Sequence, residues 1–180
     1  MALNMNRYTQ KAQEALAVAQ ELAEDHNNSH IEVEHLLLAL LRQEGGVVPQ
    51  IVAKLGMPSD ALAQEVEAEL GRMAQAYGPV QRYLSTRMNV VLRAAEDEAE
   101  RMHDEFISTE HLFLGILSAD KGRAGQLLKQ HGLSVEAVYK ALTDIRGSQR
   151  VTDQTPEGRY QALEKYARDV TKAAAQGKLD

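Results

Sequence analysis

The sequence predicts an all-α fold: an eight-helix bundle with pseudo-twofold symmetry, made of two four-helix repeats and followed by a linker and a partial helix. Two observations carry this prediction. The chain repeats itself at an offset of 76 residues. Its apolar residues recur at helical spacing, as at Ala12, Leu16, Ala19 and Ala23, while no segment alternates like a strand.

The repeat is clearest in the pattern I-x-x-E-H-L-x-L-x-x-L, which occupies residues 31–41 and returns at residues 107–117. At the same offset and without a gap, Gly56 matches Gly132. Two matching stretches of this length and register indicate a tandem duplication that runs from about Thr9 to Arg146.

Each repeat is expected to contain four helices. Thr9, Ser85 and Ser108 are typical N-cap residues, and Gly56 and Gly132 are typical of helix ends. The expected helices of repeat one (about 9–70) are 10–26, 33–44, 48–55 and 59–70, and those of repeat two (about 85–146) are 86–102, 109–119, 123–131 and 135–146. Short helices are marginal alone, so the repeats are expected to pack together as one domain, residues 1–146.

The composition changes after Arg146. Residues 147–159 are mostly polar and predict a flexible linker. Residues 160–180 read as a helix whose apolar stripe, including Leu163 and Val170, would be buried only by a partner further along the chain. The sequence therefore looks truncated within a following module.

Charge and composition argue against several kinds of ligand. The net charge of −6 and an aromatic content of 4% oppose nucleic-acid binding. The apolar runs are far shorter than the ~20 residues of a membrane helix, and no signal peptide is recognisable. These features, with no Cys in the chain, favour a cytoplasmic protein that contacts no membrane.

Motifs for catalysis are missing from the sequence. It contains no phosphate-binding loop, no G-x-S-x-G elbow and no H-E-x-x-H motif, so we expect a noncatalytic chain without its own cofactor. His26 and His30 are four residues apart but straddle a polar loop, so no metal site is expected either.

Two acidic residues occupy equivalent positions in the repeats. Glu34 precedes His35 and Glu110 precedes His111, each pair at a helix start, where capping and packing are the simplest interpretation. A pocket between the repeats offers an alternative, the recognition of extended, partly cationic peptides. Such a pocket would be lined by Thr9, Glu34, Ser85 and Glu110, with exposed parts of Val90, Val91 and Leu92 as an apolar floor.

The paired I-x-x-E-H-L-x-L-x-x-L segments resemble the double repeat of the Clp N-terminal domain, over about residues 5–146. Residues 160–180 resemble the entry into the first AAA+ ATPase module of the ClpB disaggregase branch. The turn at residues 43–46 and the long linker also resemble this branch more than the ClpC branch.

The resemblance implies the substrate-binding N-domain of a homohexameric chaperone. Such a chaperone captures unfolded or aggregated polypeptides and works with the DnaK system, while ATP and Mg²⁺ belong to modules outside this chain. The family's substrate-facing polar positions match Thr9, Asp104 and Glu110. The sequence departs from the pattern at His111, where some members have Leu, so the implied groove is shallower or lies elsewhere.

Two other functions are compatible with the sequence. In the ClpC-like alternative, Glu34 and Glu110 form two equivalent sites for adaptor proteins or arginine-phosphorylated clients. In a structural alternative, the domain mainly caps or regulates the hexamer.

Overall fold

The computed structural model describes residues 3–78 and 81–160, and the expectation for residues 161–180 lies outside this part. A short 3-10 helix, η1 (Met5–Arg7), precedes the bundle. The α-helices of repeat one are α1 (Gln10–Asp25), α2 (Val33–Arg42), α3 (Val47–Lys54) and α4 (Ser59–Leu70). Those of repeat two are α5 (Thr86–Arg101), α6 (Thr109–Ala119), α7 (Arg123–Gln130) and α8 (Val135–Arg146).

The predicted all-α fold is confirmed, and all eight expected helices are present. Each helix of repeat two begins 76 residues after its counterpart in repeat one. The caps at Thr9 and Ser85 are also confirmed, because their side chains accept hydrogen bonds from the N–H groups of Ala12 and Met88. α2 ends two residues earlier than expected, since the backbone becomes extended at Gln43 (φ −71°, ψ 122°).

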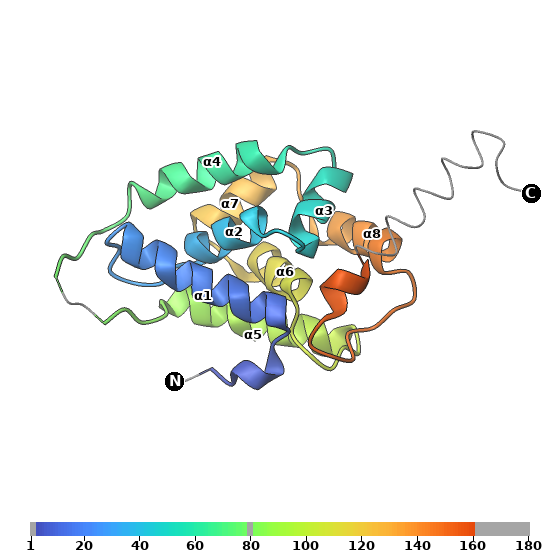
Figure 1. Cartoon of the computed structure of the whole chain (residues 1–180). Helices are drawn as coiled ribbons and strands as arrows, with labels where there is room; N and C mark the ends of the chain where they lie inside the picture. Colours follow the sequence, from blue (N-terminus) through green and yellow to red (C-terminus); the bar gives the residue numbers. More distant parts are fainter. Residues whose placement is uncertain (1–2, 79–80, 161–180) are drawn as a thin grey trace, which may run out of the picture.

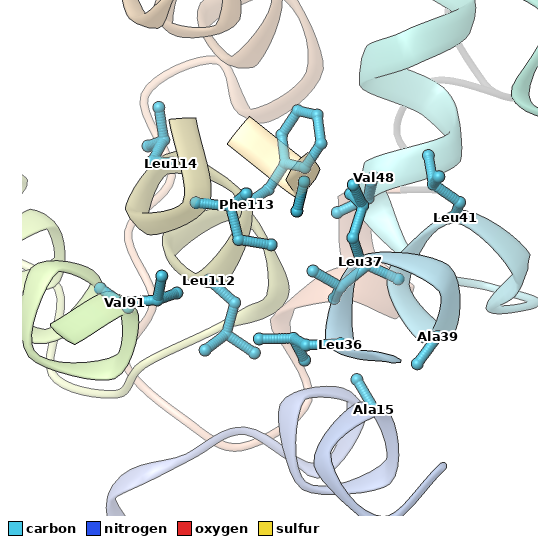
Figure 2. Close-up of a cluster of buried hydrophobic side chains, with 14 of the residues drawn as sticks. Ala15, Leu36, Leu37, Ala39, Leu41, Val48, Val91, Leu112, Phe113 and Leu114 are labelled. Carbon is cyan, nitrogen blue, oxygen red and sulfur yellow. The ribbon is translucent and has the colours of Figure 1, made fainter. Parts of the chain in front are cut away.

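α2 and α6 form the centre of the bundle. In Figure 1 they lie between the α1–α5 pair on one side and α4 with α7 on the other. Leu36, Leu37, Leu112 and Phe113, which come from these two central helices, are fully buried, and Figure 2 shows them meeting in one core. The two repeats therefore share a single hydrophobic core.

The packing of α5 against α6 requires a glycine. A Cβ atom at Gly115 would lie 2.7 Å from the carbonyl oxygen of Val91 and 3.0 Å from the backbone nitrogen of Ala95. These contacts are shorter than a side chain tolerates, so Gly115 allows the two backbones to approach.

The repeats are also joined by crossed backbone pairing. Tyr8, before α1, pairs in parallel with Ile107, before α6, and Leu84, before α5, pairs with Ile31, before α2. Each pair joins residues from different repeats, so the start of α1 meets the start of α6, and the start of α5 meets the start of α2.

The segment that follows α8 is not a free linker throughout. Residues 147–159 were expected to be flexible, but Val151 and Glu157 are buried, and so is Tyr160. The side chain of Glu157 and the backbone of Val151 contact the bundle, and the flexibility of the segment stays a prediction. Residues 156–160 are helical.

Among the described residues, no single helix is both long and apolar enough to cross a membrane. The pair α2 and α3 satisfies length and composition only when taken together, and it is bent by 82°.

Candidate functional site

The crossed pairing creates two junctions between the repeats. We call the first the Thr9 junction (Thr9, Asp104, Glu110 and His111) and the second the Ser85 junction (Asn28, Glu34, His35 and Ser85). At the Thr9 junction, the N–H of Thr9 donates to the carbonyl oxygen of Ile107 at 3.0 Å. At the Ser85 junction, the N–H of Ser85 donates to the carbonyl oxygen of Ile31 at 3.1 Å.

Both junctions contain a buried histidine with the same role. His35 Nδ1 accepts the N–H of Glu32 at 2.8 Å, so Nε2 carries the proton and donates to Asn28 Oδ1 at 2.8 Å. Burial lowers the pKa of His35 to about 4. The predicted capping and packing role is confirmed for His35, which forms a capping box at the start of α2.

His111 repeats this arrangement at the start of α6. Its Nδ1 accepts the N–H of Ser108 at 2.9 Å, and its Nε2 donates to Asp104 Oδ2 at 2.7 Å. Burial lowers the pKa of His111, although the Asp104 carboxylate opposes this shift. His111 is therefore also a neutral capping residue, and its side chain is fully buried.

The Ser85 junction is closed by an arginine of the chain itself. The Arg87 guanidinium donates to Glu34 Oε1 at 3.0 Å and to both oxygens of Asp120 at 3.0 Å each. Burial opposes the charge of Arg87, but the hydrogen bonds to Asp120 and Glu34 raise its pKa above the ordinary value. Glu34 is only 2% exposed, and Arg87 binds one of its carboxylate oxygens, Oε1, from within the protein.

The Thr9 junction differs at the equivalent positions. Lys11 corresponds to Arg87 in the repeat, but its Nζ donates to the carbonyl oxygen of Glu44 at 2.9 Å. Glu110 corresponds to Glu34 and is fully buried, and neither of its carboxylate oxygens has a hydrogen-bond partner among the described residues. Burial, together with the nearby Glu157 carboxylate, raises the pKa of Glu110 to about 8. Glu110 is therefore mostly protonated at neutral pH.

Asp104 anchors the other side of this junction. Its carboxylate accepts from Arg146 at 2.6 and 3.0 Å, and from the N–H of Val151 at 2.9 Å. Burial alone would raise the pKa of Asp104, but the hydrogen bonds from His111 and Arg146 outweigh it and lower the pKa to about 2. Asp104 is thus a buried anion with all its charge satisfied inside the protein.

The segment after α8 crosses the Thr9 junction as a partly extended chain. The N–H of Glu105 donates to the carbonyl oxygen of Val151 at 2.8 Å, and the N–H of Gln10 donates to that of Gln154 at 2.8 Å. Glu157 Oε1 then accepts from Thr9 Oγ1 at 2.8 Å. Figure 1 shows this segment, in orange to red, beside the N-terminal end of α1.

The structure separates the predicted polar site residues into two groups. Four of them meet at the Thr9 junction: Thr9, Asp104, Glu110 and His111. Glu34 and the half-buried Ser85 belong to the Ser85 junction. Whether any of these residues contacts a substrate stays a prediction.

The predicted apolar floor is wrong for two of its members. Val91 is fully buried and Leu92 is 4% exposed, because α5 turns both side chains toward the core. Figure 2 shows Val91 pointing toward α6. Only Val90, on the opposite face and 49% exposed, remains open to a ligand.

Sequence reasoning missed three residues of the Thr9 junction: Arg146, Val151 and Glu157. The only signal in the sequence was an aliphatic and an aromatic residue, Val151 and Tyr160, in an otherwise polar stretch. Arg146 also lies over the Tyr160 ring, 5.6 Å from its centroid.

A separate surface groove of about 460 Å³ lies beside the Ser85 junction. Leu16, Ile31, Tyr83 and Leu84 are among its lining residues. Within residues 3–78 and 81–160, no group of three or more His, Asp and Glu side chains is arranged to hold a metal ion.

Comparison with protein families assigns the chain to a known family. A family model described as the Clp repeat (R) N-terminal domain matches residues 7–131, which include both I-x-x-E-H-L-x-L-x-x-L segments in full. The chain belongs to this Clp N-terminal domain family. The match covers most of the double repeat and both junctions' acidic residues, Glu34 and Glu110.

The Clp N-terminal domain has similar counterparts among ClpB chaperones. The ClpB chaperone of Bdellovibrio bacteriovorus is 42% identical over 173 residues, which make up 96% of this chain and 20% of that protein. The ClpB chaperone of Nitratidesulfovibrio vulgaris is 40% identical over 183 residues, or 99% of this chain and 21% of that protein. The chain thus spans about a fifth of the length of these curated relatives.

Solved structures share the fold of this Clp N-terminal domain. The Hsp104 N-terminal domain from Candida albicans has a TM-score of 0.73 at 21% identity and covers 83% of this chain and 98% of its own. The N-terminal domain of ClpD from Arabidopsis thaliana has a TM-score of 0.60 at 23% identity and covers 81% of this chain and 99% of its own.

Proposed function

We propose that this chain is a noncatalytic substrate-capture domain, which binds extended segments of unfolded or aggregated proteins at the Thr9 junction. One observation carries the proposal: the junction holds the main chain of residues 151–154. Backbone N–H groups of Gln10 and Glu105 bind its carbonyl oxygens, and Asp104 accepts one of its N–H groups. Main-chain recognition of this kind tolerates many sequences, as capture of misfolded clients requires.

The wider role follows from the resemblance to ClpB chaperones. The full-length protein would be a homohexameric disaggregase in the cytoplasm that threads captured segments and works with the DnaK system. ATP and Mg²⁺ would be bound by modules outside this chain. Capture by a tethered N-domain would raise the local concentration of client segments near those modules.

The ClpC-like alternative has less support. It requires two equivalent acidic sites, but Glu34 is already bound by Arg87, whereas Glu110 has no hydrogen-bond partner among the described residues. The alternative in which the domain mainly caps or regulates the hexamer predicts that its deletion changes basal ATPase activity and leaves client capture intact.

The proposal is tested by titrating the ¹⁵N-labelled chain with reduced, carboxymethylated α-lactalbumin, a permanently unfolded protein. We expect the largest amide shifts at Gln10, Glu105 and Val151, and no shifts with native α-lactalbumin. Shifts confined to the groove residues Leu16 and Tyr83 would contradict the proposed site.

The repeat supplies a matched pair of variants. Thr9→Ala and Ser85→Ala each remove an N-cap hydroxyl from an equivalent helix, a loss of about 1 kcal/mol of stability, and Thr9→Ala also removes the hydrogen bond to Glu157. Only Thr9→Ala alters the Thr9 junction, so only Thr9→Ala should change the affinity for the unfolded protein. Equal affinities in the two variants would count against this site.

A further inference from the structure

We propose that residues 151–160 are a built-in competitor of the Thr9 junction, and that client segments bind there by displacing them. This inference rests on the proposed function. Residues 151–160 occupy the Thr9 junction when no client is bound, and their contacts indicate the chemistry that a client segment must match.

The segment is anchored by a few buried residues. Val151, Glu157 and Tyr160 are each fully buried, while Thr152 and Asp153 between them are exposed. A segment with buried anchors separated by exposed residues is bound as a ligand strand is bound, through its main chain and a few pockets. It is attached to α8 by a turn at Gly147, which has a positive φ of 60°.

The anchors define a pattern. An aliphatic residue donates its main-chain N–H to Asp104, an acid six residues later reaches the N-terminal end of α6, and an aromatic three residues further on lies against Arg146. At the N-terminal end of α6, the N–H of Thr109 donates to Glu157 Oε1 at 3.3 Å. The positive end of the helix dipole favours an acid there. Client segments that carry this spacing should displace residues 151–160 best.

The same contacts make the segment displaceable. Glu157 is buried beside Glu110, and Glu157 Oε2 and both Glu110 oxygens have no hydrogen-bond partner among the described residues. Two carboxylates in one buried site repel each other once both are ionised, so the hold on the segment weakens as the pH rises and Glu110 loses its proton. The segment therefore occupies the site reversibly and can be displaced.

Two variants of the complete chain move the segment in opposite directions. Val151→Asp places a charge in a buried position beside Asp104 and should release the segment. Glu157→Gln keeps an acceptor for Thr9 and removes the repulsion with ionised Glu110, so it should hold the segment more tightly at pH 9. Thr152→Asp is the matched control, because it adds the same charge at the neighbouring exposed position.

The probe is fluorescent, reduced and carboxymethylated α-lactalbumin, and its affinity is measured by anisotropy. At pH 9, where Glu110 is ionised, we expect Val151→Asp to bind the probe at least about fivefold more tightly than the unmodified chain, Glu157→Gln to bind it more weakly, and Thr152→Asp to bind it equally. A synthetic peptide of residues 149–160 should compete with the probe for the Val151→Asp chain. The same peptide carrying Val151→Asp should not compete.

Hydrogen exchange of the Gln10 and Glu105 amides reports release of the segment separately. Faster exchange in Val151→Asp with unchanged probe affinity would overturn the competitor role and leave the proposed function standing. Weaker probe binding by Val151→Asp, or unchanged exchange, would overturn it too. Failure of the probe to bind any variant would contradict the proposed function, and the competition with it.

Discussion

Glu110 and Glu157 place two carboxyl groups in one buried site, although they are 47 residues apart and belong to different parts of the chain. Glu157 is held by the Thr9 hydroxyl, whereas Glu110 has no hydrogen-bond partner among the described residues. Arg146 is the cation that acts on Glu110, and Asp104 adds a further negative charge. This pairing makes the Thr9 junction sensitive to pH.

We expect the protein to lose stability between pH 7 and pH 9. The pKa of Glu110 rises from an ordinary 4.5 to about 8 on folding, so the folded chain binds more protons than the unfolded chain between these values. The stabilising contribution of neutral Glu110 is complete below pH 4.5 and is lost as the pH rises through about 8. Denaturant unfolding at the two pH values measures the change.

Glu110→Gln should remove most of this pH dependence, because the amide stays neutral. Glu100→Gln, at an exposed position on α5, is the control and should behave like the unmodified chain. An equal loss of stability in Glu110→Gln between pH 7 and pH 9 would show that another group is responsible.

Arg87→Ala should destabilise the protein by about 2–4 kcal/mol, because it leaves the buried carboxylates of Glu34 and Asp120 without their cation. The figure is below that for a fully buried pair, since the Arg87 side chain is 36% exposed. Arg42→Ala breaks an exposed pair with Glu67 and should cost less than about 1 kcal/mol. Urea unfolding measures the stability of both variants. Similar losses of stability would show that the ion pairs of Arg87 with Glu34 and Asp120 contribute no more than an exposed pair.

Gly115→Ala should cost about 1–3 kcal/mol, since its Cβ would meet the α5 backbone at 2.7 Å. Ser118→Ala, one turn later on the exposed face of the same helix, should stay within about 0.5 kcal/mol of the unmodified chain. Thermal unfolding measures both. A neutral effect of Gly115→Ala would mean that α5 and α6 separate at little cost.

His35 should remain neutral until the pH approaches 4. Burial lowers its pKa from 6.5 to about 4, so the stability it contributes is present above pH 6.5 and is lost as the pH falls toward 4. Nuclear magnetic resonance of the imidazole Cε1–H as a function of pH measures the midpoint. A midpoint above pH 6 would mean that the ring is solvated in the folded chain.

The helices were predictable from the sequence because their determinants are local. The 76-residue repeat, the cap hydroxyls and the helical spacing of apolar residues gave helix starts that the structure places within one residue. The junctions followed in part, since equivalent residues in a duplication occupy equivalent places. That Thr9 and Ser85 lie at different junctions depends on the crossed pairing, which local patterns do not encode.

The rest depended on distant contacts. Val151 bonds to Asp104, 47 residues earlier, and a single aliphatic residue among polar neighbours gives no periodic signal. The asymmetry between Glu34 and Glu110 was also hidden, because Arg87 and Lys11 are both cations in the sequence but take different partners in space. The burial of Val91 was predictable from the helical spacing, because Val91 lies on the same buried stripe of α5 as Met88 and Ala95.

The crossed pairing of Tyr8 with Ile107 and of Leu84 with Ile31 has a consequence for how such a chain arises and assembles. Each half supplies the backbone partner that the other half lacks, so a lone half is incomplete but self-complementary. Two copies of a single ancestral unit would satisfy the same contacts across a dimer axis, and fusion of their genes would preserve every one of them. Cleavage within residues 71–84 should accordingly leave two fragments that recombine into a native complex.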